Sequence, residues 1–537
     1  MGKLFNFQSK YETESGGSIH SMKSERKPNI ILIFTDQHRL SAVGCYGDTP
    51  CQTPNIDRLA REGVRFETAY TVCPVCSPAR ATIMTGLYPH SHGICSNVHN
   101  LGSSVHELTD RPELLSRRLQ KAGYQCGYSG KWHLGTAQKR SFHAENRPSL
   151  PKDVGFHGQN FPGHGGGGFN YPEYKEYLSE NGFAHEVYQI KETPIRVMPY
   201  GVLSGPVEST VPYFLADNTI KMMDDFRRSD DPFFIWHNFW GPHGPYYSPR
   251  EFYDLYADVE IPEWPNYRWD AKNINAPYQV KVHPHVDQLT WEDWTEGIRH
   301  YYAFTTLIDQ QIGRIIHHLE QTGLIENTII IFTADHGETL GSHGGLTDKG
   351  WHHFEEIQRI PFIVRMPGEG KRDTETRRHG EKGKEDKETW GHGEGGKRDI
   401  VLREWVSTAD IYPTILDMAG GDVDESAIHG RSIMPILEGR PSEWRDAVFV
   451  EFNGVNSLAT SMMSVRKGNF KYGWNCSNWD ELYDLEEDPY EMKNLMGDPS
   501  YSDKVREMRT LMADWMAETR YPGLGMYRQS RMGQYRA

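Results

Sequence analysis

The sequence predicts an α/β fold. Helices flank a central, largely parallel β-sheet in a sandwich, followed by a smaller strand-rich subdomain with a closing helix. Continuous apolar runs, which suit strands buried on both faces, recur along the chain. Segments with helical periodicity lie between these runs, and strands alternating with helices are typical of a parallel sheet covered on both faces. After about residue 440 the pattern changes to shorter strand-like segments.

Two of the apolar runs end in an aspartate. Residues 29–35 (NIILIFT) precede Asp36, and residues 328–334 (TIIIFTA) precede Asp335. A third, shorter run is 233–237 (FFIWH). Ligand sites in parallel sheets form beyond the carboxyl ends of the strands, so we expect both aspartates to lie at such a site.

Two segments between the runs have the spacing of amphipathic helices. In the first, Leu115, Leu119 and Ala122 precede Gly123, a residue type that commonly follows the last turn of a helix. The second segment places four aliphatic residues on one helical face. These are Ile308, Ile312, Ile315 and Leu319.

Three stretches lack the apolar residues that a folded core requires. Residues 1–27 predict a flexible lead-in, and residues 368–399, rich in charges and glycine, predict a disordered surface insertion. Residues 163–168 (GHGGGG) predict a mobile loop. The larger domain is therefore expected to span 28–439 and the smaller subdomain 440–537.

The C-terminal subdomain is predicted from two strand-like regions and one helix. The strand regions are 447–452 and 463–472. The helix is indicated by apolar residues that share one face. They are Val505, Met508, Met512 and Trp515.

Composition excludes several classes of function. The net charge is −15 over 537 residues, whereas nucleic-acid-binding proteins usually carry a basic face, so we expect no nucleic-acid partner. An anionic substrate would have to be held by a local cluster of cations. The sequence contains no run of about 18 apolar residues, so no membrane span is expected. The polar N-terminus and the seven cysteines without framework spacing predict a cytoplasmic location.

Cys76 stands at the predicted start of a helix. Pro78 suits the first helical turn, and Arg80 adds a cation one turn away. Backbone N–H groups and the helix dipole favour an anion at this position, which suits an activated nucleophile. Two other interpretations stay open: Cys76 is a buried small residue, or it pairs with Cys73 in a redox or zinc motif.

Seven sequence blocks, in order along the chain, resemble the sulfatase family. They are 29–37 (NIILIFTDQ), 76–93 (CSPARATIMTGLYPHSHG), 129–135 (SGKWHLG), 240–243 (WGPH), 333–338 (TADHGE), 344–356 (GGLTDKGWHHFEE) and 481–495 (ELYDLEEDPYEMKNL). The second block resembles the family signature C-x-P-x-R followed by TG, P and HG. The resemblance implies an alkaline phosphatase-like sandwich, with 28–439 as the catalytic domain of a sulfuric ester hydrolase.

The resemblance also implies how the nucleophile arises. In the family, a maturation enzyme oxidises the cysteine that matches Cys76 to formylglycine. The hydrate of formylglycine attacks sulfur, a covalent sulfo-enzyme forms, and the hemiacetal then expels sulfate and restores the aldehyde. Such a division into two steps is ordinary covalent catalysis. The expected partners are therefore the sulfate ester and a formylglycine-generating or sulfatase-maturing enzyme.

The resemblance assigns roles to further residues. Arg80 would hold the nucleophile and balance charge, and Lys131 and Lys349 would bind sulfate oxygens. His133 would orient the formylglycine hydroxyl, and His243 would protonate the leaving oxygen, a role that suits imidazole. Other histidines near these blocks are candidates for lining the pocket. They are His90, His92, His99, His352 and His353.

Five residues align with the metal ligands of the family: Asp36, Gln37, Cys76, Asp335 and His336. Oxygen-rich ligation fits a hard cation such as Ca²⁺. Many sulfatases have aspartate at the position of Gln37 and asparagine at that of His336. These changes remove one negative charge and add a nitrogen ligand, which favours Mn²⁺ or another transition metal. Taken singly, a strand-end aspartate is usually a helix cap, and a histidine or lysine is usually structural or solvated.

The sequence leaves three functions open. The WGPHGPY turn and the C-terminal subdomain resemble carbohydrate sulfatases, which favours a sulfated carbohydrate or a small sulfate ester. Gln37 and His336 resemble formylglycine-dependent phosphonate monoester hydrolases and phosphodiesterases, whose substrates also carry one negative charge at the reacting centre. A non-catalytic binding protein on the same scaffold is the third function. The intact cysteine, lysines and metal turns argue against it.

Overall fold

The structure, a computed structural model, describes residues 26–533 with several gaps. The gaps are 99–104, 106, 137–148, 185, 191–198, 270–287, 368–399, 441–442, 455–459 and 477–478. The predicted insertion at 368–399, nearly all of the predicted lead-in at 1–27, and His99 therefore lie outside the described residues.

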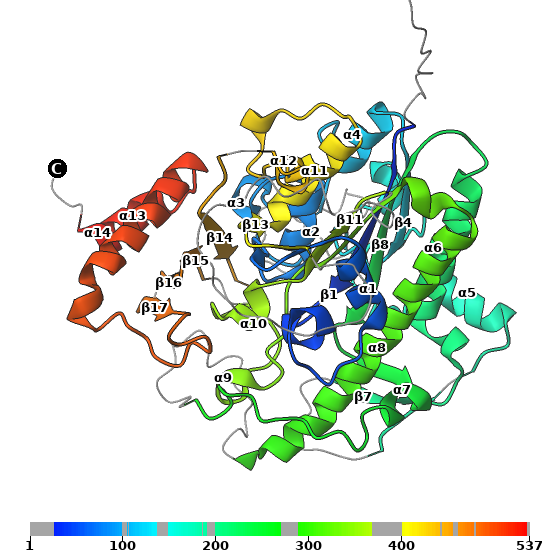
Figure 1. The fold of residues 1–537 in the computed structure, drawn as a ribbon, viewed down its shortest axis with the longest axis horizontal. Helices are drawn as coiled ribbons and strands as arrows, with labels where there is room; N and C mark the ends of the chain where they lie inside the picture. The colour runs from blue at the N-terminus through cyan, green and yellow to red at the C-terminus, as the bar shows by residue number, and fades with distance from the viewer. Residues whose placement is uncertain are drawn as a thin grey trace, which may run out of the picture.

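An eight-stranded, mostly parallel sheet forms the centre of the larger unit (Figure 1). In spatial order its strands are β12 (Ile400–Leu402), β2 (Val64–Phe66), β11 (Phe362–Arg365), β10 (Thr328–Ala334), β1 (Asn29–Asp36), β8 (Phe233–Pro242), β4 (Gln125–Gly130) and β5 (His157–Gly158). In this sheet only β11 runs antiparallel to its neighbours. The predicted α/β class is confirmed, and the three apolar runs are β1, β8 and β10.

The pairing of β1 with β10 places the two predicted aspartates side by side. The strands run parallel in register from Asn29 opposite Thr328 to Thr35 opposite Ala334. Asp36 follows Thr35 and Asp335 follows Ala334, so the two aspartates lie side by side at one edge of the sheet. Every residue of β1 is buried, and a slip of one residue would exchange its two faces, so this register is strongly fixed.

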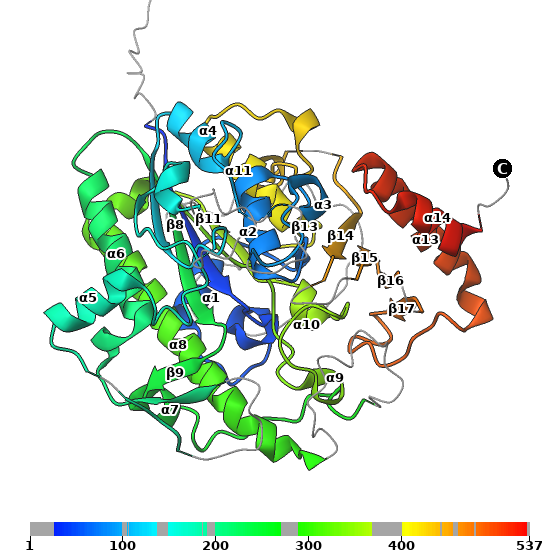
Figure 2. The same cartoon turned by 180° about the vertical axis from the view of Figure 1, so that it is seen from behind.

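Helices cover both faces of the sheet, as Figures 1 and 2 show from opposite sides. Ile31 and Ile33 pack in a core with α1, α6 and α8, whereas Ile30 and Leu32 pack in a second core with α2, α4 and α11. The first group is α1 (Pro54–Glu62), α6 (Val211–Phe226) and α8 (Trp291–Gln321). The second is α2 (Cys76–Thr85), α4 (Leu115–Lys121) and α11 (Ile411–Met418). The helices predicted from aliphatic spacing are α4 and α8.

A four-stranded antiparallel sheet with a helix against it forms the C-terminal unit. Its strands are β14 (Ala447–Phe452), β15 (Met462–Lys467), β16 (Phe470–Asn475) and β17 (Glu481–Asp484), and its helices are α13 (Ser502–Glu518) and α14 (Leu524–Met532). The predicted closing helix is α13, and the strand region 463–472 is a hairpin of β15 and β16. The hairpin turns at Gly468, whose φ of 53° is left-handed. The predicted boundary near residue 440 stays a prediction.

The remaining elements are short. The described strands are β3 (Ala69–Tyr70) and β13 (Val406–Ser407), paired in one small sheet, and β6 (Val187–Tyr188), β7 (Tyr200–Leu203) and β9 (Tyr246–Pro249) in another. The described helices are α3 (Pro89–His92), α5 (Pro172–Glu180), α7 (Arg250–Asp254), α9 (Ser342–Gly345), α10 (Glu355–Gln358) and α12 (Met434–Leu437). Within the described part of the chain, no helix combines the length and apolar character needed to cross a membrane.

Candidate active site

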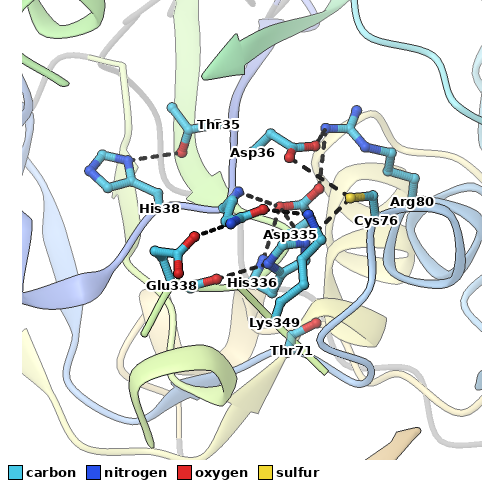
Figure 3. A network of polar contacts seen from close by, with 12 residues as sticks. Thr35, Asp36, His38, Thr71, Cys76, Arg80, Asp335, His336, Glu338 and Lys349 are labelled. Atoms are coloured by element: carbon cyan, nitrogen blue, oxygen red, sulfur yellow. Dashed lines mark hydrogen bonds and ion pairs between the residues drawn. The ribbon is translucent and has the colours of Figure 1, made fainter. Parts of the chain in front are cut away.

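The predicted site residues meet beyond the carboxyl ends of four neighbouring strands. Asp36 ends β1, Asp335 follows β10, Lys131 follows β4, and His243 follows β8. The first residue of α2, Cys76, lies against them (Figure 3). This is the edge at which open α/β sheets form ligand sites, so the placement follows from the topology of the sheet.

Sharp turns after the strands direct the polar groups inward. Gln37 and His133 have left-handed backbones, with φ values of 60° and 54°, a conformation that costs a non-glycine residue about 1–2 kcal/mol. The backbone N–H of Gln37 donates to Asp335 Oδ1 at 2.9 Å, and that of His243 donates to the Asp36 carbonyl at 3.0 Å. These bonds join three of the turns and hold the left-handed Gln37 conformation in place.

The Cys76 thiol lies among charged groups and is completely buried. Its Sγ is 3.4 Å from Lys131 Nζ, 3.4 Å from His336 Nε2 and 3.8 Å from Asp36 Oδ1. All the described cysteines are free thiols, and Cys73 packs in an apolar cluster. The surroundings of Cys76 therefore favour the nucleophile over both the redox pair and the inert core residue.

Arg80 joins the two aspartates from within α2, and its side chain is fully buried. Its Nη2 lies 2.8 Å from Asp36 Oδ2 and 3.3 Å from Asp335 Oδ2. Its Nη1 donates to the Lys131 carbonyl at 2.7 Å and to Asn238 Oδ1 at 2.8 Å. One guanidinium thus balances two buried carboxylates and ties α2 to the ends of four strands, β1, β4, β8 and β10.

The two predicted lysines contact different parts of the site. Lys131 Nζ lies 2.6 Å from Asp36 Oδ2, and the Lys349 ammonium donates to the side-chain oxygen of Gln37. The Gln37 amide nitrogen donates to the Glu338 carboxylate. Ammonium can only donate and carboxylate can only accept, so these two partners fix the amide with its oxygen on the Lys349 side.

Burial and charge shift the pKa values of the acidic groups in opposite directions. Burial alone would raise the pKa of Asp36, but the cations Lys131 and Arg80 hold it well below its usual range. Burial and the neighbouring charge of Asp36 raise the pKa of Asp335. Burial and Asp36 also oppose ionisation of Cys76, yet nearby cations, Lys131 first, lower the pKa of the thiol overall. The site therefore favours an anion at position 76.

The donor atoms at this centre suit a single cation. One ligand atom from each of Asp36, Cys76, Asp335 and His336 lies within 4.8 Å of the others, and all four residues are buried. Metal–ligand bonds of about 2.0–2.6 Å fit a cluster of this size. Asp335 Oδ1 also accepts the backbone N–H of His336 at 3.0 Å, which holds one of its oxygens in place. The residues present thus form a buried candidate metal site.

A second group of side chains that could bind a metal already accepts hydrogen bonds or ion pairs from neighbouring side chains. His343, Glu356 and Glu491 lie within the same mutual distance. However, Asn266 Nδ2 donates to Glu356 Oε1 at 2.6 Å and lies 3.2 Å from His343 Nδ1, and Lys471 pairs with Glu491. The group contains neither Cys76 nor a strand-end aspartate, and an amide and an ammonium already pair with its acceptors, so we interpret it as a structural network.

The candidate histidines separate into two sets, those given catalytic roles and those proposed to line the pocket. His133 and His243 lie with the lysines, and between them lies His164, which the sequence argument did not select. The His164 ring centroid is 4.8 Å from that of His133 and 5.3 Å from that of His243. In the sequence, a single histidine within a run of glycines gives no indication that its side chain lies beside His133 and His243. Asn238, also missed, directly follows the run 233–237 in β8, which is the signal that could have found it.

Among the pocket-lining candidates, His90 and His92 make hydrogen bonds typical of structural residues. His90 binds Glu451 of the C-terminal unit, with Nδ1 to Oε2 at 2.6 Å. His92 Nε2 lies 3.2 Å from Thr82 Oγ1. His352 and His353 are buried; the first lies beside the Phe354 ring and the second against Gly473.

Family models match almost the whole described chain. A model described as Sulfatase matches residues 28–421. The chain belongs to the sulfatase family. A second model, described as N-sulphoglucosamine sulphohydrolase, C-terminal, matches residues 394–518 of this sulfatase. The protein is therefore a sulfuric ester hydrolase of the alkaline phosphatase-like superfamily, as the sequence blocks predict.

Relatives match this sulfatase over nearly their full length. It is 29% identical over 523 residues to the uncharacterized sulfatase YidJ of Escherichia coli (strain K12), covering 93% of this chain and 88% of that protein. It is 28% identical over 535 residues to the N-acetylglucosamine-6-O-sulfatase of Bacteroides thetaiotaomicron, with coverage of 91% and 86%. The solved phosphonate monoester hydrolase of Agrobacterium radiobacter superposes with a TM-score of 0.68 at 25% identity, with coverage of 92% and 95%.

Proposed function

We propose that this sulfatase hydrolyses a sulfate ester of a carbohydrate, with formylglycine made from Cys76 as the nucleophile and one bound divalent cation. The observation that carries the proposal is the position of the Cys76 thiol. It lies at a helix N-terminus, 3.4 Å from a buried lysine, within the cluster that contains both strand-end aspartates. Formylglycine would supply, as its hydrate, an oxygen nucleophile in place of the thiol. The host must then supply a formylglycine-generating or sulfatase-maturing enzyme.

The chain's own cations would bind the charged part of the substrate. Lys131 Nζ lies 3.4 Å from Cys76 Sγ, and the charge of Lys349, which donates to the Gln37 side-chain oxygen, also acts on the thiol. Fixed positive charges in a buried site stabilise the charge that develops on the sulfate oxygens, because they need no reorganisation during the reaction. Arg80 remains ion-paired with Asp36 and Asp335 and balances their negative charge, so we assign it a positioning role.

His243 is proposed to move the proton at the leaving oxygen. Its Nδ1 lies 2.7 Å from the Gly244 carbonyl, which can only accept, so Nδ1 carries a hydrogen and Nε2 is the exchangeable position. Burial, followed by the charges of Lys349 and Lys131, lowers the pKa of His243. An anionic ester between the lysines would offset their charge and raise that pKa, so protonation is coupled to substrate binding.

The cation is proposed to be held by Asp36, Gln37, Asp335 and His336, together with the residue at position 76. It would supply a concentrated positive charge that polarises the nucleophile and the sulfate oxygens. The oxygens of the aspartates and Gln37 favour Ca²⁺, and the His336 nitrogen makes Mn²⁺ the alternative. Elemental analysis of the purified protein identifies the ion directly.

The carbohydrate is inferred from the relatives. The C-terminal segment matches a model described as N-sulphoglucosamine sulphohydrolase, C-terminal, and one relative is named as an N-acetylglucosamine-6-O-sulfatase. One observation favours a second candidate function, phosphonate monoester or phosphodiester hydrolysis. Gln37 and His336 resemble that branch, and a solved phosphonate monoester hydrolase shares 25% identity over 92% of this chain.

A substrate panel separates these functions. Protein with verified conversion of Cys76 is assayed with sugar sulfates, an aryl sulfate, a phosphodiester and a phosphonate monoester. The proposal expects the highest kcat/KM with a sugar sulfate. A higher kcat/KM with the phosphonate ester would replace it with the second function, and no turnover of any ester would support a non-catalytic role.

A further inference from the structure

We propose that His164 is a specificity-determining residue that contacts the leaving group of the bound ester and favours a leaving group rich in hydroxyls. This inference rests on the proposed function, because it takes the lysines beside Cys76 as the anion-binding groups. It rests on the position of one imidazole and on the turn that holds it there.

The glycine-rich segment around His164 is a packed turn. Gly165, Gly167 and Gly168 have φ values of 79°, 79° and 85°, which side-chain-bearing residues rarely adopt. The backbone N–H of Gly168 donates to the Gly165 carbonyl at 3.0 Å. The sequence predicts a mobile loop over 163–168, and its mobility stays a prediction; in the structure this hydrogen bond and these dihedrals shape the segment into a turn.

Space around the turn is too small for side chains. A Cβ added at Gly165 would lie 2.4 Å from the Tyr171 ring, and one at Gly168 would lie 2.4 Å from Val211 Cγ1. A Cβ at Gly167 would meet Pro245 Cδ at 3.0 Å, within the turn that carries His243. The glycines therefore let the turn dock closely on the His243 turn, and this docking places His164 in the site.

His164 forms the next layer outward from the proposed anion-binding groups. Lys131 and His133 are fully buried and Trp240 is nearly so, whereas His164 and His243 are half-buried. The Lys131 ammonium lies 4.5 Å from the centroid of the Trp240 ring, and the His164 ring is 4.1 Å from that ring. Moving outward, the Lys131 ammonium is thus followed by the Trp240 indole and then by the His164 imidazole.

The leaving group must lie on the His164 side of the sulfate. In an in-line displacement the leaving oxygen lies opposite the attacking atom, and the attacking atom here is at position 76. The proposed acid for that oxygen is His243, whose ring is 5.3 Å from that of His164. A group bonded to the leaving oxygen therefore extends past His243 toward His164.

The chemistry of His164 matches a hydroxyl. Burial lowers its pKa, and the positive charge of Lys131 lowers it further, so the ring is neutral at neutral pH. A neutral imidazole offers one donor and one acceptor, which is also what a sugar hydroxyl offers. The same positive surroundings disfavour a cationic leaving group, such as a quaternary ammonium alcohol.

Calorimetry on an inactive background tests this contact without requiring turnover. The background is Cys76→Ala, and the added changes are His164→Ala, His164→Gln and the control His317→Ala, an exposed histidine of α8. The probes are N-acetylglucosamine 6-sulfate, galactose 6-sulfate and inorganic sulfate. Loss of one hydrogen bond predicts that His164→Ala raises the Kd of the better-bound sugar sulfate about tenfold, with the Kd of sulfate changed less than about twofold. Glutamine, which keeps a donor and an acceptor, should recover most of the loss.

Kinetics on the formylglycine-containing enzyme gives the matching readout. His164→Ala should raise KM for the sugar sulfate about tenfold and change kcat/KM for 4-nitrophenyl sulfate less than about twofold, because that leaving group has no hydroxyls. Equal weakening of sugar sulfate and inorganic sulfate, or unchanged sugar binding, would overturn the proposal. So would a sugar sulfate that binds no more tightly than inorganic sulfate. An enzyme without turnover would refute the proposed function, while the calorimetry still decides the role of His164.

Discussion

Replacing Arg80 by methionine should destabilise the protein strongly, and a divalent cation should restore much of the loss. Arg80 is fully buried and lies 2.8 Å and 3.3 Å from the carboxylates of Asp36 and Asp335. Methionine fills similar space without a charge, so two neighbouring buried carboxylates lose the cation that joins them. Removing one partner of a buried ion pair costs about 3–5 kcal/mol.

This cost converts into a measurable shift of the thermal unfolding midpoint. At about 2.1 cal/mol/K per residue, a unit of roughly 400 residues has an unfolding entropy near 0.8 kcal/mol/K, so the midpoint should fall by about 4–6 °C. The assay is differential scanning calorimetry in chelator. The matched control is Arg228→Met, because Arg228 pairs with Asp225 at 3.1 Å but is 78% exposed. Exposed pairs contribute about 0.2–1 kcal/mol, which predicts a shift of about 1 °C or less.

The same variant tests the metal site. A cation bound between Asp36 and Asp335 replaces part of the missing charge, so added Ca²⁺ or Mn²⁺ should raise the midpoint of Arg80→Met more than that of the wild type. A midpoint in chelator within about 1 °C of the wild type would refute the claim that Arg80 balances two ionised carboxylates. Equal stabilisation of both proteins by the cation would refute the idea that guanidinium and cation share those carboxylates.

Three further outcomes are expected. Lys131→Met should lower kcat/KM by about 10²–10³ without unfolding the protein, and a loss below about tenfold would remove Lys131 from the anion-binding groups. Asp335→Asn should reduce metal content, measured by elemental analysis after dialysis; full occupancy with full activity would reject the ligand. The third outcome is a pH dependence of stability. Burial opposes protonation of His90, but the Glu451 carboxylate raises its pKa overall. The pair therefore stabilises the folded state fully below the unfolded pKa of about 6.5 and loses that effect as the pH rises through the folded pKa. The midpoint difference between wild type and His90→Gln should shrink as the pH rises, and a difference that grows would contradict the ion pair.

The strands that carry the metal turns could be predicted because their signals are local. β1 and β10 are apolar along their whole length, and an aspartate follows the last apolar residues of each. A parallel sheet then requires both aspartates to lie at one edge. The position of Cys76 followed from Pro78 and the helix start. These residues needed no knowledge of distant contacts.

The parts that failed depend on contacts between distant segments. His164 reaches the site only because its glycine turn packs on Val211 and Pro245, far along the chain. His90 lies within the family block 76–93, but its side chain binds Glu451 of the C-terminal unit. Nearness along the chain to a site motif therefore did not predict which histidines reach the site.

The central claim is that Cys76 becomes formylglycine, and a peptide mass tests it most directly. Trypsin should release residues 66–80 (FETAYTVCPVCSPAR), which contain Cys73 and Cys76. In protein from its native host, treated with an alkylating reagent, this peptide should take up one alkyl group, on Cys73. It should also be lighter, at position 76, by the mass of H₂S less one oxygen atom. A peptide alkylated at both positions, in protein that still turns over its substrate, would contradict the account.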